Sequence, residues 1–185
     1  LIAKEQTDAY GRRGRDWHSP RGGLWMTITL KGSKEIDLNM IPIITAISII
    51  KALKKTTKIE AEIKWPNDIQ FKDKKIGGII CETEIYGEEI KWIMIGIGIN
   101  INIQTNSFPI NLRQKTTSIE NITNKKHDIE KISKEIIKEF YKNIKNNKKD
   151  IIAEWRKKEQ TLKRKVFILS KNNKIQARVT DITYD

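Results

Sequence analysis

The chain contains 185 residues, of which 38% are hydrophobic and 32% are charged, and its formal net charge is +13. This length and apolar content are typical of a domain with one principal core, which excludes an intrinsically disordered chain. A positive excess of this size favours an anionic ligand or partner.

The composition also excludes membrane-spanning and disulfide-stapled proteins. No apolar run reaches the roughly 18 residues of a membrane span, and the start LIAKEQ has no basic segment of the kind that opens a secretory signal. The single cysteine, Cys81, has no partner for an intrachain disulfide and is interpreted as a small buried hydrophobe. These features predict a cytoplasmic protein.

The first predicted elements are two strands, at residues 1–6 and 23–30, which flank an arginine-rich loop. The sequence GRRGRDWHSPRGGLW (11–25) combines several arginines with glycines, whose backbone amides can approach an anion. An arginine fork pairs with phosphate or carboxylate oxygens, whereas the lysines spread along the chain need no ligand. We therefore expect the loop to bind an anion.

A helix and two hairpins follow the loop. Apolar residues at 41, 44, 47, 50 and 53 predict a core-packed helix over 40–55, with Asn39 as its N-cap. Short strands at 61–65 and 69–71 enclose the turn PND, and the run 76–102 contains two longer strands. Such consecutive hairpins predict a largely antiparallel sheet.

The C-terminal part is predicted to contain helices and a final hairpin. After a loop at 103–117 and a helical turn at SIEN, Asp128 is expected to cap a long helix whose apolar stripe comprises positions 129, 132, 136, 137, 140, 141 and 144. Asp150 is expected to cap another helix, which carries Ile151, Ile152 and Trp155. From about residue 163, the pattern KVFILS, KNNK, KIQARVTDI predicts a hairpin.

Three further motifs contain groups that suit an anionic ligand. KWPND presents Asn67 and Asp68 on a proline-fixed turn after Lys64, a pattern that suits Mg²⁺ bound beside phosphates. KIGGIICE places Lys75 at the end of a hairpin turn, and the glycines of GIGININ (96–102) leave room for a ligand on a strand. Each motif alone also has an ordinary explanation as a capped turn, a solvated lysine or a tightly packed strand.

Several common classes of site are excluded. His18 and His127 have no cysteine or histidine at metal-ligand spacing, so the sequence predicts no zinc site. The dinucleotide fingerprint is excluded because GIG is not followed by a third glycine or a helix. The sequence also contains neither a G-x-S-x-G elbow nor a Walker loop.

Taken together and in this order, the four motifs resemble the catalytic domain of biotin protein ligases, and the match runs from Gln6 to about Trp155. The resemblance implies an α+β fold like that of class II aminoacyl-tRNA synthetases, with a mixed, mainly antiparallel sheet and helices packed on one side. It implies a catalytic domain over residues 1–160 and the start of a small C-terminal β-barrel over 161–185. The Ser/Thr-Thr-Asn segment that closes the family's biotin pocket is expected upstream of Leu1.

By this resemblance, the biotin carboxylate attacks the α-phosphorus of MgATP, and the resulting biotinyl-5′-AMP transfers biotin to a lysine of a biotin carboxyl carrier protein. The implied small molecules are biotin, ATP and Mg²⁺. A homodimer is compatible with the resemblance, whereas a membrane partner is not expected. Fixed positive charge is needed because two anions react, and Arg12 and Lys75 are expected to supply it.

The resemblance also assigns individual positions. Tyr10 departs from the basic residue that some members have there. The positions expected to contact biotin are Gln6, Tyr10, Gly11, Arg12, Lys75, Gly78 and Gly96. Those expected to serve the nucleotide are Arg12, Arg15, Trp17, Lys64, Asn67, Asp68 and Asn100, with Asp68 as the Mg²⁺ ligand.

Two alternative functions are left open. A lipoate or octanoate ligase or transferase has a related fold, although the arginine loop fits it poorly, and competition between biotin and lipoate would distinguish the two. A basic nucleic-acid-binding module is favoured by the net charge, and its affinity should fall steeply with salt and need no ATP. The sequence contains no recognised nucleic-acid motif, so DNA binding is not supported.

Overall fold

A computed structural model describes residues 1–33, 35–169 and 173–181. Its centre is a six-stranded sheet in the order β1-β2-β6-β5-β4-β3, in which every named strand pair is antiparallel. The strands are β1 (Ile2–Ala3), β2 (Leu24–Lys31), β3 (Glu62–Lys64), β4 (Asp68–Phe71), β5 (Lys74–Tyr86) and β6 (Glu89–Ile99). This confirms the predicted antiparallel hairpins, although the first strand is only two residues long.

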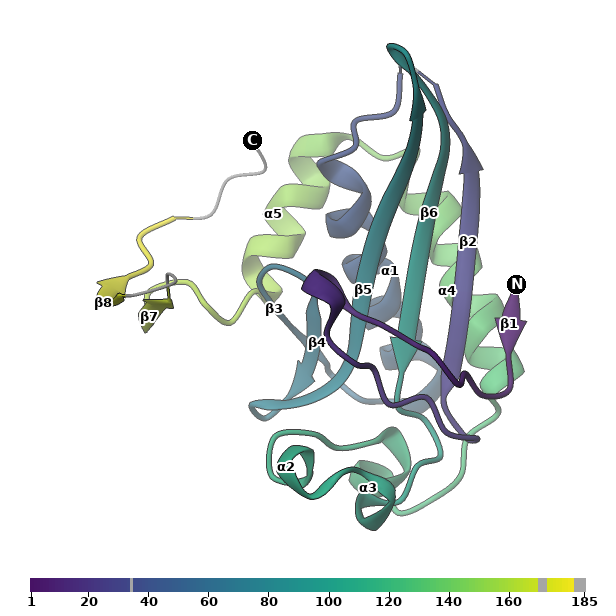
Figure 1. Cartoon of the computed structure of the whole chain (residues 1–185), viewed down its shortest axis with the longest axis vertical. Helices are drawn as coiled ribbons and strands as arrows, with labels where there is room; N and C mark the ends of the chain where they lie inside the picture. The colour runs from purple at the N-terminus through teal and green to yellow at the C-terminus, as the bar shows by residue number, and fades with distance from the viewer. Residues whose placement is uncertain (34, 170–172, 182–185) are drawn as a thin grey trace.

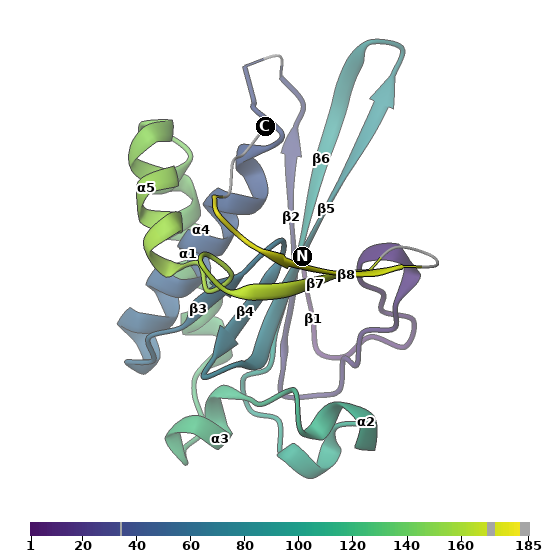
Figure 2. The ribbon, with the colours of Figure 1, turned by 90° about the vertical axis from the view of Figure 1, so that its left-hand side faces the viewer.

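Three helices cover one face of this sheet, and the arginine-rich loop crosses the other (Figures 1 and 2). The covering helices are α1 (Met40–Thr57), α4 (Ile129–Asn143) and α5 (Lys148–Lys158). Shorter elements connect β6 to α4: the 3-10 turn η2 (Thr105–Ser107), α2 (Ile110–Arg113) and α3 (Ile119–Thr123). The predicted α+β architecture with helices on one side is therefore confirmed. None of the helices in the described ranges has the length and apolar character of a membrane span.

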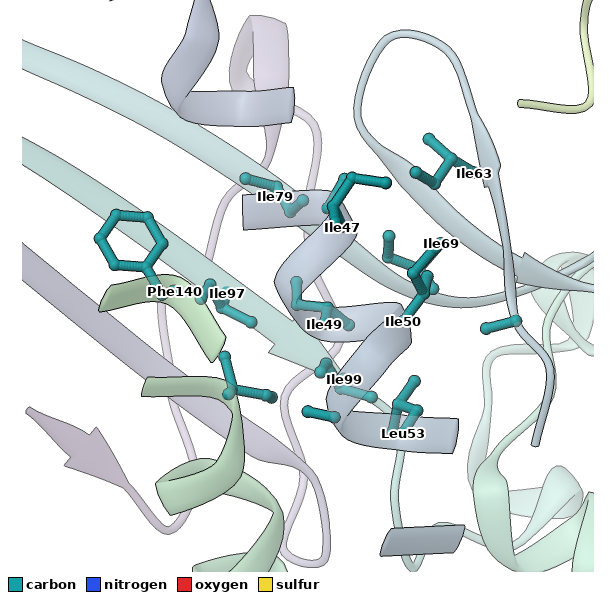
Figure 3. Packing of buried hydrophobic residues seen from close by; sticks show 14 of the residues in the cluster. Ile47, Ile49, Ile50, Leu53, Ile63, Ile69, Ile79, Ile97, Ile99 and Phe140 are labelled. Atoms are coloured by element: carbon teal, nitrogen blue, oxygen red, sulfur yellow. The ribbon is translucent and has the colours of Figure 1, made fainter. Parts of the chain in front are cut away.

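The core lies between α1 and the sheet. Alternation along β6 turns Ile93, Ile95, Ile97 and Ile99 toward the helices, because successive side chains of a strand point to opposite faces. Figure 3 shows the isoleucines of α1 packed against those of β4, β5 and β6, with Phe140 of α4 beside them. The opposite face of β6 carries Gly96 and Gly98, so it is free to receive the loop.

The capping residues predicted for three helices had different outcomes. The Asp128 carboxylate accepts a hydrogen bond from the Lys131 backbone N–H at 3.0 Å, as the sequence predicts. The prediction for Asp150 is wrong, because α5 starts one turn earlier and the Asn147 side chain accepts from the Lys149 N–H at 2.9 Å. Asn39 stands at the start of α1, but its side chain makes no capping hydrogen bond.

The predicted stripe of α4 is partly wrong. Tyr141 is 52% exposed, whereas Glu139 and Asn143 are buried against α1. The Glu139 carboxylate pairs with Lys55, and the Asn143 amide donates to the Ser48 hydroxyl at 2.9 Å. Polar partners on α1 therefore bring two polar side chains of α4 into the interface.

The chain ends in a two-stranded hairpin of β7 (Lys165–Leu169) and β8 (Lys174–Arg178), which confirms the predicted strands. The first two residues of the predicted KNNK turn, 171 and 172, and the residues from 182 lie outside the described residues. The linker between α5 and β7 runs along β3, where the Gln160 N–H donates to the Ile63 carbonyl at 2.8 Å.

Candidate active site

The arginine-rich loop is itself a small hairpin. The Gly11 N–H donates to the Arg15 carbonyl at 2.7 Å, and the Trp17 N–H donates to the Ala9 carbonyl at 2.9 Å. At its tip lies the 3-10 turn η1 (Arg12–Gly14), in which Arg13 has φ 62° and Gly14 has φ 66°. Consecutive left-handed residues close the turn tightly, and the arginines of the tip are exposed.

Trp17 anchors this loop to the sheet. Gly78 of β5 and Gly98 of β6 are directly paired, and the Trp17 indole lies on both. A β-carbon at Gly98 would come within 2.8 Å of the indole, and one at Gly78 within 3.3 Å. The glycines therefore create the flat platform on which the loop rests.

Lys75 and Asp68 form an ion pair on the same face. The Lys75 ammonium lies 2.6 Å from an Asp68 carboxylate oxygen and 4.9 Å from the centre of the Trp17 ring. The Lys75 backbone is also fixed, because its N–H donates to Lys115 and its carbonyl accepts from Thr117. Both charged side chains are largely withdrawn from solvent, with 29% and 25% exposure.

Arg12 reaches the same turn from the loop. Its guanidinium lies 3.5 Å from the Asn67 side-chain oxygen, the limit of a hydrogen bond. The Asn67 amide in turn donates to the Ile79 carbonyl at 3.0 Å. Because Asn67 and Asp68 are consecutive, Arg12 and Lys75 both contact one turn, as a shared anion site requires.

A second contact holds the loop on β5. The Tyr10 hydroxyl lies 3.2 Å from both carboxylate oxygens of Glu82. This hydrogen bond and the nearby negative charge raise the pKa of Tyr10 above its usual range, because both favour the neutral phenol. Cys81, the preceding residue, is half-buried, and burial raises the pKa of its thiol to about 12.

The remaining predicted positions lie around this cluster with different accessibility. The Gln6 side-chain oxygen accepts from the Ser19 hydroxyl at 3.0 Å, while Lys64 and Arg15 are exposed. Gly96 faces Ile80, whose methyl would lie 2.6 Å from an added β-carbon. Asn100 is buried at 2% exposure, and its amide donates to the Thr117 carbonyl, so it supports the segment beside Lys75.

Comparison with known proteins assigns the chain to a family. A model of the biotin/lipoate A/B protein ligase family matches residues 1–100. The chain belongs to this family.

The similar members of the biotin/lipoate A/B protein ligase family are biotin protein ligases. The bifunctional ligase/repressor BirA of Bacillus subtilis is 36% identical over 132 residues, which cover 69% of this chain and 40% of that protein. The biotin–[acetyl-CoA-carboxylase] ligase of Paracoccus denitrificans is 31% identical over 104 residues, 55% of this chain and 43% of that protein. This chain therefore spans about two fifths of the length of these relatives.

Solved structures of the same family share the fold. The biotin protein ligase from Aquifex aeolicus in complex with biotin and ATP has a TM-score of 0.85 and 28% sequence identity, and the match covers 100% of this chain and 78% of that one. The enzyme from Leishmania major in complex with biotinyl-5-AMP has a TM-score of 0.71 and 25% identity, with 86% and 70% coverage. The resemblance predicted from the four motifs is confirmed at the level of the family.

The sequence analysis expected the glycines of GIGININ to leave room on a strand but assigned only Gly96 to the site, whereas Gly98 on the same face contacts Trp17. One contact of the candidate site was missed altogether. Glu82 had no signal in the sequence, because its partner Tyr10 is 72 residues away in the chain.

Asp68 and Asn67 could hold a Mg²⁺ ion only if a bound ligand supplies most of the oxygen atoms that coordinate the ion. Among the described residues, no group of three or more histidine, cysteine or acidic side chains converges on one point. Asp68 offers one carboxylate beside the Asn67 amide, and protein-bound Mg²⁺ commonly uses one or two carboxylates with substrate phosphates. This donor set therefore suits an ion that arrives with a nucleotide.

Proposed function

We propose that this chain carries the catalytic domain of a biotin protein ligase, with residues 1–160 as that domain and 161–185 as part of a C-terminal β-barrel. The proposed reaction forms biotinyl-5′-AMP and pyrophosphate from biotin and ATP, and then transfers biotin to a lysine of a biotin carboxyl carrier protein. The observation that carries the proposal is the convergence of Arg12 and Lys75 on the turn of Asn67 and Asp68. The relatives named above support it.

The chemical problem is repulsion between the biotin carboxylate and the nucleotide phosphates. Arg12 and Lys75 would reduce this repulsion and stabilise the charge that develops at the α-phosphate. Lys75 is well placed for this role because its ammonium lies 2.6 Å from Asp68 and 4.9 Å from the centre of the Trp17 ring, so it is already directed at the turn that would hold the ion.

Asp68 would hold Mg²⁺ together with the nucleotide phosphates, and the ion would neutralise part of their charge. Trp17 would contact the adenine of the nucleotide, and the exposed Arg15 would contact its phosphates. The loop also covers the glycine platform, so it would protect a labile anhydride from water.

The first test is Lys75→Ala, assayed by biotin-dependent release of pyrophosphate from ATP. We expect the rate to fall on the order of 10²- to 10³-fold, the scale of losing one charge-stabilising group in a site. Lys74→Ala is the matched control, since Lys74 is an exposed lysine next to Lys75. Equal rates for Lys75→Ala and the control would overturn the role of Lys75.

The second test concerns retention of the adenylate. Arg12→Gly should release biotinyl-5′-AMP faster than the unmodified protein, whereas Arg13→Gly should not, because glycine suits the φ of 62° at that position. Retention is followed by filtration of radiolabelled adenylate, and equal retention in Arg12→Gly and the unmodified protein would exclude the role of Arg12. When a carrier protein is added together with labelled biotin or lipoate, labelling of its lysine by lipoate in place of biotin would favour a lipoate ligase.

A further inference from the structure

β3 is the edge strand of the six-stranded sheet, and the linker after α5 covers it. The edge would otherwise expose backbone groups without partners. The Gln160 N–H donates to the Ile63 carbonyl, and the Trp65 N–H donates to a carboxylate oxygen of Glu159 at 2.9 Å. A side chain thus replaces the neighbouring strand at the last residue before the PND turn.

Glu159 is a nearly buried carboxylate, with 8% exposure, that accepts four hydrogen bonds. Besides Trp65, the Thr161 N–H donates to it at 2.6 Å, the Thr161 hydroxyl at 2.5 Å and the Leu162 N–H at 2.9 Å. A buried carboxylate is tolerated when its oxygens are satisfied in this way. One side chain therefore joins the end of α5, the linker and the start of the turn.

The turn that Glu159 holds carries both contacts of the candidate active site. Asn67 meets Arg12, and Asp68 meets Lys75. At the Asp68 end, the turn is fixed by strand pairing with Gly78. At the Trp65 end, the Glu159 side chain accepts the Trp65 backbone N–H and so anchors the turn.

A second contact fixes the linker on the same side of the sheet. The Arg164 guanidinium lies 2.8 Å from the Asp73 carboxylate, in the turn between β4 and β5. This exposed pair contributes little energy by itself, but it holds the residue before β7 next to the end of β4. The linker is therefore attached to both turns that flank β4.

We propose that Glu159 is a positioning residue for the nucleotide, which acts by fixing the Trp65 end of the turn that presents Asn67 and Asp68. This inference rests on the proposed ligase function for the identity of the ligand. Glu159 itself touches no reacting atom. Its replacement should weaken nucleotide binding more than biotin binding, because Asp68, the proposed Mg²⁺ ligand, lies in the turn, whereas Gln6 and Tyr10 are held by Ser19 and Glu82 outside it.

The test compares Glu159→Gln with Glu154→Gln in the whole chain. Glutamine retains one oxygen acceptor and directs an amide at the remaining N–H donors, while Glu154→Gln removes a carboxylate of α5 that pairs with Lys51 at 2.6 Å and does not contact the turn. For Glu159→Gln we expect the KM for ATP to rise about tenfold, the scale of one hydrogen bond to a charged group, with the KM for biotin within about twofold. Glu154→Gln should change neither KM by more than about twofold.

A second measurement, hydrogen exchange, does not depend on enzymatic activity and complements the KM values. Hydrogen exchange of the Trp65 amide should become faster in Glu159→Gln and stay unchanged in Glu154→Gln, because a neutral amide oxygen is a weaker acceptor than a carboxylate and only the first variant changes the group that this N–H contacts. Glu159→Asp, which keeps the charge but shortens the side chain by one methylene, is the second variant and should act in the same direction to a smaller extent. All measurements are made well below the unfolding midpoint of each variant.

An unchanged KM for ATP in Glu159→Gln, or an equal rise in the two KM values, would overturn the positioning role. A wild-type chain that binds ATP by calorimetry but releases no pyrophosphate in response to biotin would instead overturn the proposed ligase function. In that case the ATP affinities of Glu159→Gln and Glu154→Gln decide the role of Glu159 alone. A wild-type chain without affinity for ATP would overturn both.

Discussion

At the scale of single residues, the position of the loop depends on the absence of two side chains. Trp17 lies against the sheet because Gly78 and Gly98 have no β-carbons. A methyl group at Gly98 would lie 2.8 Å from the indole, closer than such contacts occur. The sheet below is fixed by backbone pairing on both sides, so the loop would be the part that moves.

Gly98→Ala should therefore loosen the loop. Overpacking of this kind costs about 1–3 kcal/mol, so tryptic cleavage at the loop arginines Arg12, Arg13 and Arg15 should accelerate about fivefold or more. Limited proteolysis followed by mass spectrometry measures the cleavage rates.

The double variant Gly98→Ala/Trp17→Ala is the control, because its clash is removed with the indole. Gly98→Ala should add little acceleration in that background, a coupling that only contacting residues show. The same acceleration in both backgrounds would mean that the glycine acts through the strand and not through Trp17.

At the scale of elements, two helix starts determine how α4 and α5 meet α1. Asp128 and Asn147 each satisfy backbone N–H groups that the first turn leaves without partners. Asp150 lies inside the first turn of α5, where its charge interacts with the helix dipole but its carboxylate accepts no capping hydrogen bond.

Asn147→Ala should lower the free energy of unfolding by about 1 kcal/mol, whereas Asp150→Ala should lower it by only a few tenths. Urea titrations of the two variants and the unmodified protein measure the difference. A larger loss for Asp150→Ala would show that α5 starts where the sequence predicted.

The junction between α3 and α4 should make stability depend on pH. His127 bonds to the Thr123 hydroxyl at 2.7 Å, and its pKa is lowered from 6.5 by burial first and by the charge of Lys125 second. The unfolded chain then binds a proton at a higher pH than the folded chain, so stability falls as the pH drops below about 6.5 and through the folded pKa. In His127→Gln, the free energy of unfolding measured by urea titration should therefore change less between pH 7 and pH 5. An imidazole pKa above 6.5 in the folded protein, measured by NMR, would contradict this prediction.

At the scale of the whole molecule, one core joins the sheet to the three helices. Ile47 is fully buried at its centre, whereas Ile110 on α2 is 80% exposed. Ile47→Ala should therefore cost about 2–5 kcal/mol in the free energy of unfolding, while Ile110→Ala should stay within about 0.5 kcal/mol. Urea unfolding followed by circular dichroism measures both, and similar losses for the two variants would contradict a single core around α1.

The sequence predicted the fold well where the signal was local. Glycine and proline turns marked the hairpins, and Asp128 marked the start of α4. The prediction for α1 was one apolar stripe, but the helix is buried on several sides because it lies between the sheet and two other helices. Periodicity within one segment cannot report such a second neighbour.

Prediction of the candidate site from the sequence was limited in the same way. The motifs pointed to Arg12, Lys75 and the PND turn through their resemblance to a family, and in the structure Arg12 and Lys75 both contact that turn. The Glu159 contact to Trp65 spans 94 residues, and nothing in either segment marks the other. Long-range side-chain contacts of this kind are decided by packing and not by local pattern.

The contact between Lys75 and Trp17 has an optical consequence. Indole emission responds to nearby charge, and here an ammonium group lies 4.9 Å from the ring centre while the ring lies on Gly78 and Gly98 of the sheet. Subtracting the spectrum of Trp17→Phe from that of the unmodified protein isolates this signal from the other four tryptophans. The molecule thus contains its own spectroscopic reporter, and arrival of a ligand beside the lysine can be timed in a stopped-flow instrument without any attached dye.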